Sequence, residues 1–345
     1  MTKQPTIYEE RRRKLKLNIL EDLYNLRALT TEQLSSRFDY SIRHIGRITR
    51  ELQAEQLLIT EKVRGYEKHK GFQGNYYRIS TKGIRYLNQA DFNTSRTSDQ
   101  LRVSEHYLPY ILSLNDLHLR VEPHGWEVIN SRDVKAKFNL NRGDNIHGML
   151  ISPDGTKYGV YIFLNSVIEY NMKKIKSEIR RYNNTDFPNM LILCKTEDGF
   201  NQVVSELHAF SGIVNYFTFK VLPFGFGINY LKEFDSEDTI LDFLNDFGVI
   251  PYPEADISEA PIGLETVVIH EDEEKYFINM LDNDLEKLQT IRNYRKERYE
   301  LDGRKLLIVT NMGNRYPNLL EDIHHIDYLH ITHEEIVDYF HRNSN

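Results

Sequence analysis

The sequence predicts a mixed α/β protein, α+β overall, in which a basic helical segment precedes alternating strands and helices. Three observations support this class. Residues 9–58 place apolar side chains at helical spacing, residues 148–222 alternate short apolar strands with helical segments, and residues 265–340 repeat that alternation. A chain of 345 residues has room for two or three domains.

Charge is distributed unevenly along the chain. Residues 1–90 contain 18 Lys and Arg against 10 Asp and Glu, residues 91–230 contain 15 of each, and residues 231–345 contain 11 against 26. The net charge of −7 therefore conceals a basic N-terminal segment. Such asymmetry is typical of a protein that contacts nucleic acid with one end only. We expect the acidic end to face solvent or a basic partner.

Several classes of protein are excluded by what the sequence lacks. A single cysteine, Cys194, rules out an internal disulfide and a cysteine-based zinc site, and fits a reducing compartment. The basic residues near the start are followed by no apolar segment, so we expect no signal peptide. No stretch approaches the roughly 18 apolar residues of a membrane span. We therefore expect a cytoplasmic protein that does not contact a membrane.

The first predicted helix covers residues 9–29. Its apolar stripe consists of Leu15, Ile19, Leu23 and Leu26. We interpret the basic run at residues 11–14 as a solvated helix end, with supplementary phosphate contacts as the alternative.

A helix-turn-helix is predicted over residues 30–58. Thr30 or Thr31 is a suitable N-cap for a short helix, and a turn at residues 39–41 leads into a second helix over residues 42–54. Three apolar positions at helical spacing on this second helix must face a core: Ile45, Ile48 and Leu52.

The opposite face of the second helix carries the candidate DNA-binding residues. Arg43, Arg47 and Arg50 recur at helical spacing, with His44 beside them and Ser41 at the helix N-terminus. A DNA major groove accepts such a helix, and arginine suits both phosphate oxygens and guanine edges. We expect Arg43, His44 and Arg47 at base edges and Arg50 on a phosphate. The alternative is a solvated surface helix.

A strand–loop–strand pattern follows, with strands at residues 57–60 and 76–80 around a mostly basic loop at 61–75, and a helix begins at Thr81. This order predicts a winged helix-turn-helix, whose wing reaches the phosphate backbone or the minor groove. The candidate contacts on the wing are Arg64, Lys68, His69, Lys70 and Gln73.

Residues 1–90 are therefore predicted to form a winged-helix DNA-binding domain, and the polar residues 91–100 a linker. The expected partner is double-stranded DNA. Most winged helices bind paired half-sites as dimers, so we expect a homodimer.

Residues 101–250 are predicted to form an α/β domain. It begins with a helix over residues 101–121 and a strand at 126–129, and continues with a hairpin over 148–164. Further helices and strands are expected at 167–182, 190–194, 201–210 and 217–222.

The order hairpin, helix, strand, helix, strand recurs in residues 265–340, where helices are expected over residues 285–299 and 319–324. IKSEIRRY resembles YRKERY and MLILCK resembles LLIVTN at matching places. We expect tandem copies of one unit, with the acidic second copy over residues 251–345. Chance similarity of generic α/β elements is the alternative.

This layout is that of restriction-endonuclease-like domains, which need an Asp on one hairpin strand and an acidic-x-Lys pair on the next to hold a metal. Here residues 145–148 supply no carboxylate, and residues 160–164 carry neither acid nor lysine. We therefore predict degenerate nuclease-like units without catalysis. A metal-dependent nuclease using Asp144, Asp154 or Glu265 is the alternative, although an Asp beside Gly usually forms a turn.

Other candidate sites are weaker, and no cofactor or metal is expected. The histidines at 324, 325, 330 and 333 lack a regular ligand spacing. Gly225-Phe226-Gly227 is followed by no clean helix start, so it is not a dinucleotide loop.

The segments TTEQLSSRF and RITRELQAEQLL resemble the winged helix of the replication-relaxation family of plasmids and mobile elements. LPYILSLNDLHLRV, GWEVI, GMLISPDGTKYGVYIF and KIKSEIRRY are similar to the blocks that follow in that family, so the resemblance covers about residues 10–195. It implies an accessory DNA-binding protein of replication, relaxation or conjugative transfer. The family often has an Arg-Pro-Asp sequence and an acidic residue where this chain has Ile146-His147-Gly148 and Tyr161-Ile162-Phe163.

The prediction is a sequence-specific, non-enzymatic DNA-binding protein of plasmid or mobile-element replication, relaxation or transfer. A replication or relaxation protein is the expected partner of the acidic C-terminal region. A transcriptional regulator of the element's own genes is the alternative.

Overall fold

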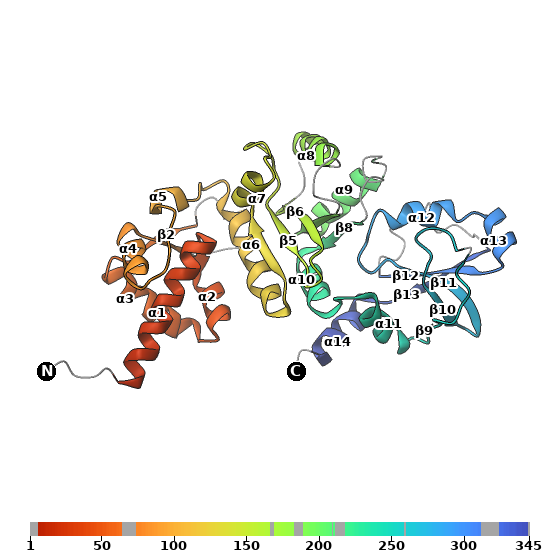
Figure 1. The fold of residues 1–345 in the computed structure, drawn as a ribbon, viewed down its shortest axis with the longest axis horizontal. Coiled ribbons are helices and arrows are strands. Elements are labelled where there is room, and N and C mark those ends of the chain that lie inside the picture. Colours follow the sequence, from red (N-terminus) through yellow and green to blue (C-terminus); the bar gives the residue numbers. More distant parts are fainter. Residues whose placement is uncertain are drawn as a thin grey trace. The chain divides into compact units, whose positions relative to one another are not determined.

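The computed structural model describes residues 6–63, 74–165, 169–182, 189–208, 210, 218–258, 260–311 and 324–343. The chain separates into two compact units, Met1–Pro123 and His124–Asn345 (Figure 1). The described residues form helices and three β-sheets, so the predicted mixed α/β class is confirmed. Within these ranges, every helix is too short or too polar to cross a bilayer.

The first unit consists mainly of helices. Its elements are α1 (Ile7–Leu26), β1 (Leu29–Thr30), α2 (Thr31–Phe38), α3 (Ile42–Ala54), β2 (Leu58–Lys62), β3 (Asn75–Ile79), α4 (Thr81–Gln89), α5 (Ser98–Leu101) and α6 (Leu108–Val121), and a 3-10 turn follows (Glu122–His124). The three strands form an antiparallel sheet in the order β1-β3-β2.

Capping side chains define where α2 and α3 begin. The Thr30 hydroxyl accepts a hydrogen bond from Gln33 N, and Thr30 N donates to Gln33 Oε1 at 3.1 Å. The Ser41 hydroxyl accepts from His44 N at 3.2 Å and caps α3. Asp39, with φ of 53°, ends α2 in the left-handed conformation and makes the turn. The two predicted helices therefore lie where they were expected.

One face of α3 packs into the core of the first unit. Ile45, Ile48 and Leu52 are fully buried, together with Ile19 and Leu23 of α1. Burial of each such side chain contributes about 1.5–3 kcal/mol to folding. Because the core takes this face, the opposite face of α3 lies at the surface.

The boundary between the units falls after Pro123, later in the chain than the expected linker at residues 91–100. Helix α6 belongs to the first unit because it bonds to the segment after α1. Asn115 Nδ2 donates to the carbonyl oxygens of Leu26 and Ala28, at 3.0 and 2.6 Å.

The second unit contains two five-stranded sheets. Its elements are β4 (Glu127–Asn130), α7 (Ser131–Lys137), β5 (Gly148–Ile151), β6 (Lys157–Phe163), α8 (Glu169–Tyr182), β7 (Asn189–Cys194), α9 (Glu197–His208), β8 (Thr218–Pro223), α10 (Phe224–Glu233), α11 (Glu237–Asn245), β9 (Ile250–Pro251), β10 (Val267–His270), β11 (Glu273–Asn279), α12 (Lys287–Asn293), α13 (Lys296–Asp302), β12 (Lys305–Thr310), β13 (Ile326–His330) and α14 (His333–Asn343).

The two sheets have the same topology. Their strand orders are β4-β5-β6-β7-β8 and β9-β10-β11-β12-β13, each in chain order. In both sheets the first three strands pair antiparallel and the last two add in parallel. The two sheets therefore share both strand order and strand direction, and the interpretation as tandem copies stays a prediction.

The sheets nevertheless belong to one unit, with no division near residue 250. Residues 282–285 leave the second sheet and lie along β8 of the first, where Asp284 bridges Lys220 in antiparallel register. Asn283 Nδ2 donates to Val221 O at 2.7 Å, and Val221 N donates back to Asn283 O at 3.3 Å. A single apolar core continues from one sheet to the other.

Several predicted elements are wrong in detail. The helix over 101–121 begins only at Leu108, because Pro109 belongs to the first turn of a new helix. The helix over 285–299 is divided into α12 and α13. Gly225-Phe226-Gly227 lies inside α10, where an added Cβ at Gly227 would approach Leu193 to 2.7 Å. The helix expected at 319–324 lies largely outside the described residues.

Candidate nucleic-acid interface

The exposed face of α3 presents the three predicted arginines. Arg43, Arg47 and Arg50 are all exposed, and His44 is half-buried. Ser41 is exposed as well, but its hydroxyl already caps α3. The structure therefore brings these five predicted residues together at the surface of one helix.

None of these arginines forms an ion pair with a carboxylate in the described part of the chain. Arg50 Nε donates to the carbonyl oxygen of Gly46, one turn earlier, at 2.8 Å. One Arg47 nitrogen lies 3.5 Å from the Tyr8 hydroxyl and 3.3 Å from His44 Nδ1. Neither contact of Arg47 is with a carboxylate, so these contacts orient the guanidinium without an acidic partner.

Other basic residues of the first unit have acidic partners. Arg12 and Lys16 of α1 both bond to Glu51 of α3, and Lys16 lies 2.6 Å from Glu55. Burial alone would raise the pKa of the Glu51 carboxyl, but hydrogen bonds from Arg12 and Lys16 hold it below its usual value. Within the predicted basic run at 11–14, Arg12 therefore binds α3 and is not free to bind phosphate.

Two further arginines of the unit are paired in the same way. Arg37 bonds to Asp22 at 3.2 Å and to Glu122, and Arg78 bonds to Glu61 at 2.7 Å. The contrast with the exposed face of α3 indicates that its positive charge is not used to hold the fold together.

Aromatic and apolar side chains that the sequence analysis did not select lie beside the arginines. The Tyr40 ring stacks on His44 at 4.7 Å, with 16° between the planes. Ile42, the first residue of α3, is 55% exposed, and Tyr8 is 57% exposed. The exposure of Ile42 could have been predicted, because Ile42 lies outside the apolar stripe of α3. The position of Tyr8 could not, because only tertiary packing brings Tyr8 to this face.

The predicted wing residues Arg64, Lys68, His69, Lys70 and Gln73 lie outside the described residues. Strands β2 and β3, which lead to and from that segment, pair in register from Leu58↔Ile79 to Lys62↔Asn75.

In the second unit, the position expected for a nuclease metal is filled by an internal hydrogen-bond network. Glu178 of α8 is fully buried, and both its oxygens accept from Asn145 N at 2.8 Å. The Tyr161 hydroxyl of β6 donates to Glu178 at 3.0 Å. Burial raises the pKa of the Glu178 carboxyl, although the bonds from Asn145 and Tyr161 oppose that shift.

His147 lies at the start of the same hairpin, where the sequence analysis noted a missing carboxylate. Its Nδ1 accepts a hydrogen bond from Ile162 N at 2.9 Å. Burial, with a smaller contribution from Lys135, lowers the pKa of His147 to about 3. The neutral imidazole is therefore part of the packing of this hairpin.

The three carboxylates considered for an unorthodox nuclease have separate local partners. Asp144 is buried and accepts from Arg181 at 2.8 Å and from the Tyr182 hydroxyl at 2.9 Å. Asp154 accepts from Thr156 N at 3.0 Å in a turn, and Glu265 accepts from a backbone N–H two residues earlier. Within the described ranges, no group of three His, Cys, Asp or Glu residues has the geometry to hold a metal ion.

The C-terminal histidines also have individual roles. The His325 ring stacks on Tyr299 at 5.6 Å, and its Nε2 lies 3.0 Å from Tyr294 O. His333 packs near Phe226, with ring centroids 5.8 Å apart.

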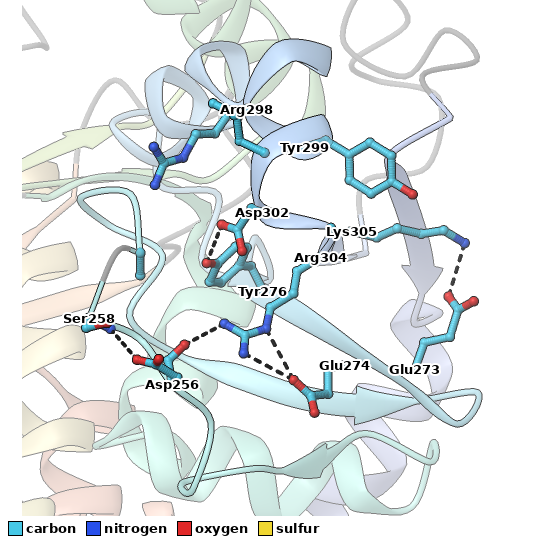
Figure 2. A pocket seen from close by; sticks show the side chains of 13 residues that line it. Asp256, Ser258, Glu273, Glu274, Tyr276, Arg298, Tyr299, Asp302, Arg304 and Lys305 are labelled. Carbon is cyan, nitrogen blue, oxygen red and sulfur yellow. Dashed lines mark hydrogen bonds and ion pairs between the residues drawn. The ribbon is translucent and has the colours of Figure 1, made fainter.

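A cavity of about 800 Å³ opens in the second unit near β11 and α13 (Figure 2). Arg304 extends into it and bonds to Glu274 at 3.2 Å and to the carbonyl oxygen of Asp256 at 2.6 Å. The Tyr276 hydroxyl donates to Asp302 at 2.5 Å. Because these polar groups bond to one another, we assign no ligand to this cavity.

The fold and the exposed arginines define a mixed α/β protein with a candidate nucleic-acid interface in its first unit. Residues 20–184 match the family model described as Replication-relaxation, the family that the sequence resemblance indicated. No curated protein and no solved structure matches the chain. This match suggests a role in replication or relaxation of a plasmid or mobile element.

Proposed function

We propose that this chain is a sequence-specific, non-enzymatic DNA-binding protein that acts in plasmid or mobile-element replication, relaxation or transfer. In this proposal, residues 1–90 are a winged helix-turn-helix, and α3 is the helix that enters the major groove. The order of elements from α1 to α4 and the antiparallel β2–β3 pair support this proposal.

One observation carries the proposal. Arg43, Arg47 and Arg50 are exposed and have no carboxylate partner in the described residues, whereas Arg12 and Arg37 of the same unit are paired with carboxylates. Three like charges on one helix face repel one another, so such a face costs free energy unless a polyanion binds it. Duplex DNA provides both phosphate charge and guanine acceptors for arginine.

The dimensions of α3 also fit the major groove of duplex DNA. Its 13 residues span about 20 Å, and a helix fits within a major groove about 12 Å wide. We propose that Arg47, held by Tyr8 and His44, contacts a base edge with Arg43, and that Arg50 contacts a phosphate.

The absence of catalysis is part of the proposal. The side chains at the nuclease-like position form internal hydrogen bonds: the Tyr161 hydroxyl donates to Glu178, and His147 Nδ1 accepts from Ile162 N. A metal site needs carboxylate oxygens open to the ion, whereas the Glu178 oxygens are buried and bonded to Asn145.

Two further expectations remain proposals. The chain binds paired half-sites as a homodimer, as most winged helices do. The acidic C-terminal region, with 26 Asp and Glu against 11 Lys and Arg over residues 231–345, docks a basic surface of a replication or relaxation protein.

The test is a titration of the full chain onto duplexes selected from a randomised pool, followed by fluorescence anisotropy. Loss of a bidentate arginine–guanine contact costs about 1–3 kcal/mol, so Arg47→Ala should weaken binding about 5- to 150-fold. Arg12→Ala is the matched control, because Arg12 is engaged with Glu51. Equal affinity of Arg47→Ala and wild type would overturn the assignment.

The competing nuclease hypothesis has a separate test. Purified chain is incubated with supercoiled plasmid and Mg²⁺ or Mn²⁺. We expect no nicking above a heat-denatured control. Metal-dependent nicking that Asp144→Ala abolishes would establish the enzyme instead.

A further inference from the structure

Helix α3 contains a glycine that the fold does not require. Gly46 lies in the middle of α3, its backbone is not in the left-handed region, and an added Cβ would meet nothing within 4 Å. Glycine in a helix interior is less favourable than alanine because it loses more backbone entropy on folding. By contrast, a Cβ at Gly83 would come within 2.2 Å of Leu57 O, so packing explains that glycine.

Gly46 lies on the face of α3 that carries the exposed arginines. Ile42, Gly46 and Arg50 follow one another at four-residue spacing, so they lie along one line of the helix. Arg43 and Arg47 form the neighbouring line. The missing side chain of Gly46 therefore leaves open space on the surface of α3, between the exposed side chains of Ile42 and Arg50.

Ile42 is a second residue of α3 whose side chain the core of the fold does not use. Its side chain is 55% exposed, although isoleucine loses favourable burial free energy at such a site. It precedes Arg43 at the N-terminal end of α3, the end that reaches base edges when such a helix enters a major groove. The apolar group that a major groove offers is the C5-methyl group of thymine.

We propose that α3 approaches DNA most closely at Gly46 and that Ile42 packs on a thymine methyl next to the base contacted by Arg43. This inference rests on the proposed function and adds the chemistry of the half-site. It makes Ile42 a specificity-determining residue, and the half-site contains a thymine beside an arginine-contacted base pair.

The first experiment removes single methyl groups from the DNA. Duplexes selected by the full chain are resynthesised with deoxyuridine in place of thymine, one position at a time, and titrated by fluorescence anisotropy. We expect one position at which wild type loses about fourfold in affinity, the value for one buried methyl group. Ile42→Ala should bind with lower affinity and should show no loss at that position.

The second experiment separates folding from binding. Gly46→Ala should raise the midpoint of urea unfolding, since alanine is the better helix former, and should weaken binding to the selected duplex about tenfold or more. Gly225→Ala is the matched control, because Gly225 is also helical and also has no atoms near an added Cβ. It should stabilise the chain and leave DNA affinity unchanged.

The outcomes distinguish this inference from the proposed function. If wild type selects and binds a sequence but no thymine methyl matters, or Ile42→Ala keeps the methyl dependence, the inference is overturned and DNA binding stands. Unchanged affinity of Gly46→Ala would overturn the close approach. If wild type selects no sequence at all, both the inference and the proposed function are overturned.

Discussion

A nitrogen of the Arg47 guanidinium lies 3.5 Å from the hydroxyl of Tyr8, so the first turn of α1 touches the exposed face of α3. Arg47 also lies 3.3 Å from His44, whose ring stacks on Tyr40. These contacts include no carboxylate, so they orient the Arg47 guanidinium and leave its charge available. Preorganisation of this kind reduces the entropy lost when a side chain binds.

The Tyr8 contact gives the first prediction. Tyr8→Phe removes only the hydroxyl that accepts from Arg47, so affinity for a selected duplex should fall by about 0.5–1.5 kcal/mol, the value of one hydrogen bond. Urea unfolding should be unchanged, because Tyr8 is mostly exposed. If anisotropy titrations give equal affinities for Tyr8→Phe and wild type, this contact does not orient the arginine for binding.

Arg50 gives the second prediction, which concerns salt. If Arg50 neutralises a phosphate, Arg50→Ala should reduce the slope of log K against log salt concentration by about 0.9. Anisotropy titrations at several NaCl concentrations measure the slope. Arg78→Ala is the control because Arg78 is paired with Glu61. If Arg50→Ala leaves the slope of log K against log salt concentration unchanged, Arg50 does not contact a DNA phosphate.

His147 gives the third prediction, a dependence of stability on pH. The folded pKa of His147 is about 3 because the ring is buried near Lys135, whereas an unfolded histidine titrates near 6.5. Below pH ~6.5 the unfolded chain therefore binds a proton that the folded chain does not. The contribution of His147 to stability is complete above that pH and falls by about 1.4 kcal/mol per unit as the pH decreases toward 3.

His147→Asn isolates this effect, because an amide oxygen can accept from Ile162 N and does not titrate. Urea unfolding between pH 7 and pH 4 should show a smaller loss of stability for the variant than for wild type. Parallel pH profiles would mean that the imidazole is not held neutral in the folded chain.

Asp282 gives the fourth prediction, which concerns the join between the two sheets. This buried carboxylate lies 3.2 Å from Lys220 Nζ and 3.0 Å from Lys287 Nζ. Asp282→Asn leaves the mostly buried Lys220 without this charge, so the free energy of unfolding should fall by about 3–5 kcal/mol. Asp246→Asn is the control, since its pair with Arg342 is exposed and should be worth at most about 1 kcal/mol. Similar small losses for both variants would contradict a structural role for Asp282.

Local sequence patterns predicted much of the fold. The bounds of α3 follow from Ser41, which caps it, and from the spacing of Ile45, Ile48 and Leu52. The first helix of the predicted pair, α2, and both hairpin strands around the turn at residues 152–156 could be located in the same way. The bounds of these helices and strands depend on residues that are close together in the sequence, so local sequence patterns are enough to predict them.

Features that depend on distant residues could not be predicted. Nothing near Tyr8 in sequence indicates its contact with Arg47, 39 positions away. The return of residues 282–285 to β8 likewise depends on hydrogen bonds between residues of the two sheets, which are about 60 positions apart in the sequence. The pairing of Arg12 with Glu51 could not be inferred either, because 39 positions separate the two residues in the sequence.

The central claim is that the exposed face of α3 recognises duplex DNA. The most direct measurement is selection from a randomised duplex pool by the full wild-type chain and by the double variant Arg43→Ala, Arg47→Ala. We predict that wild type enriches a defined sequence and that the variant, folded by circular dichroism, enriches none. Enrichment of the same sequence by both proteins, or of no sequence by wild type, would contradict the claim.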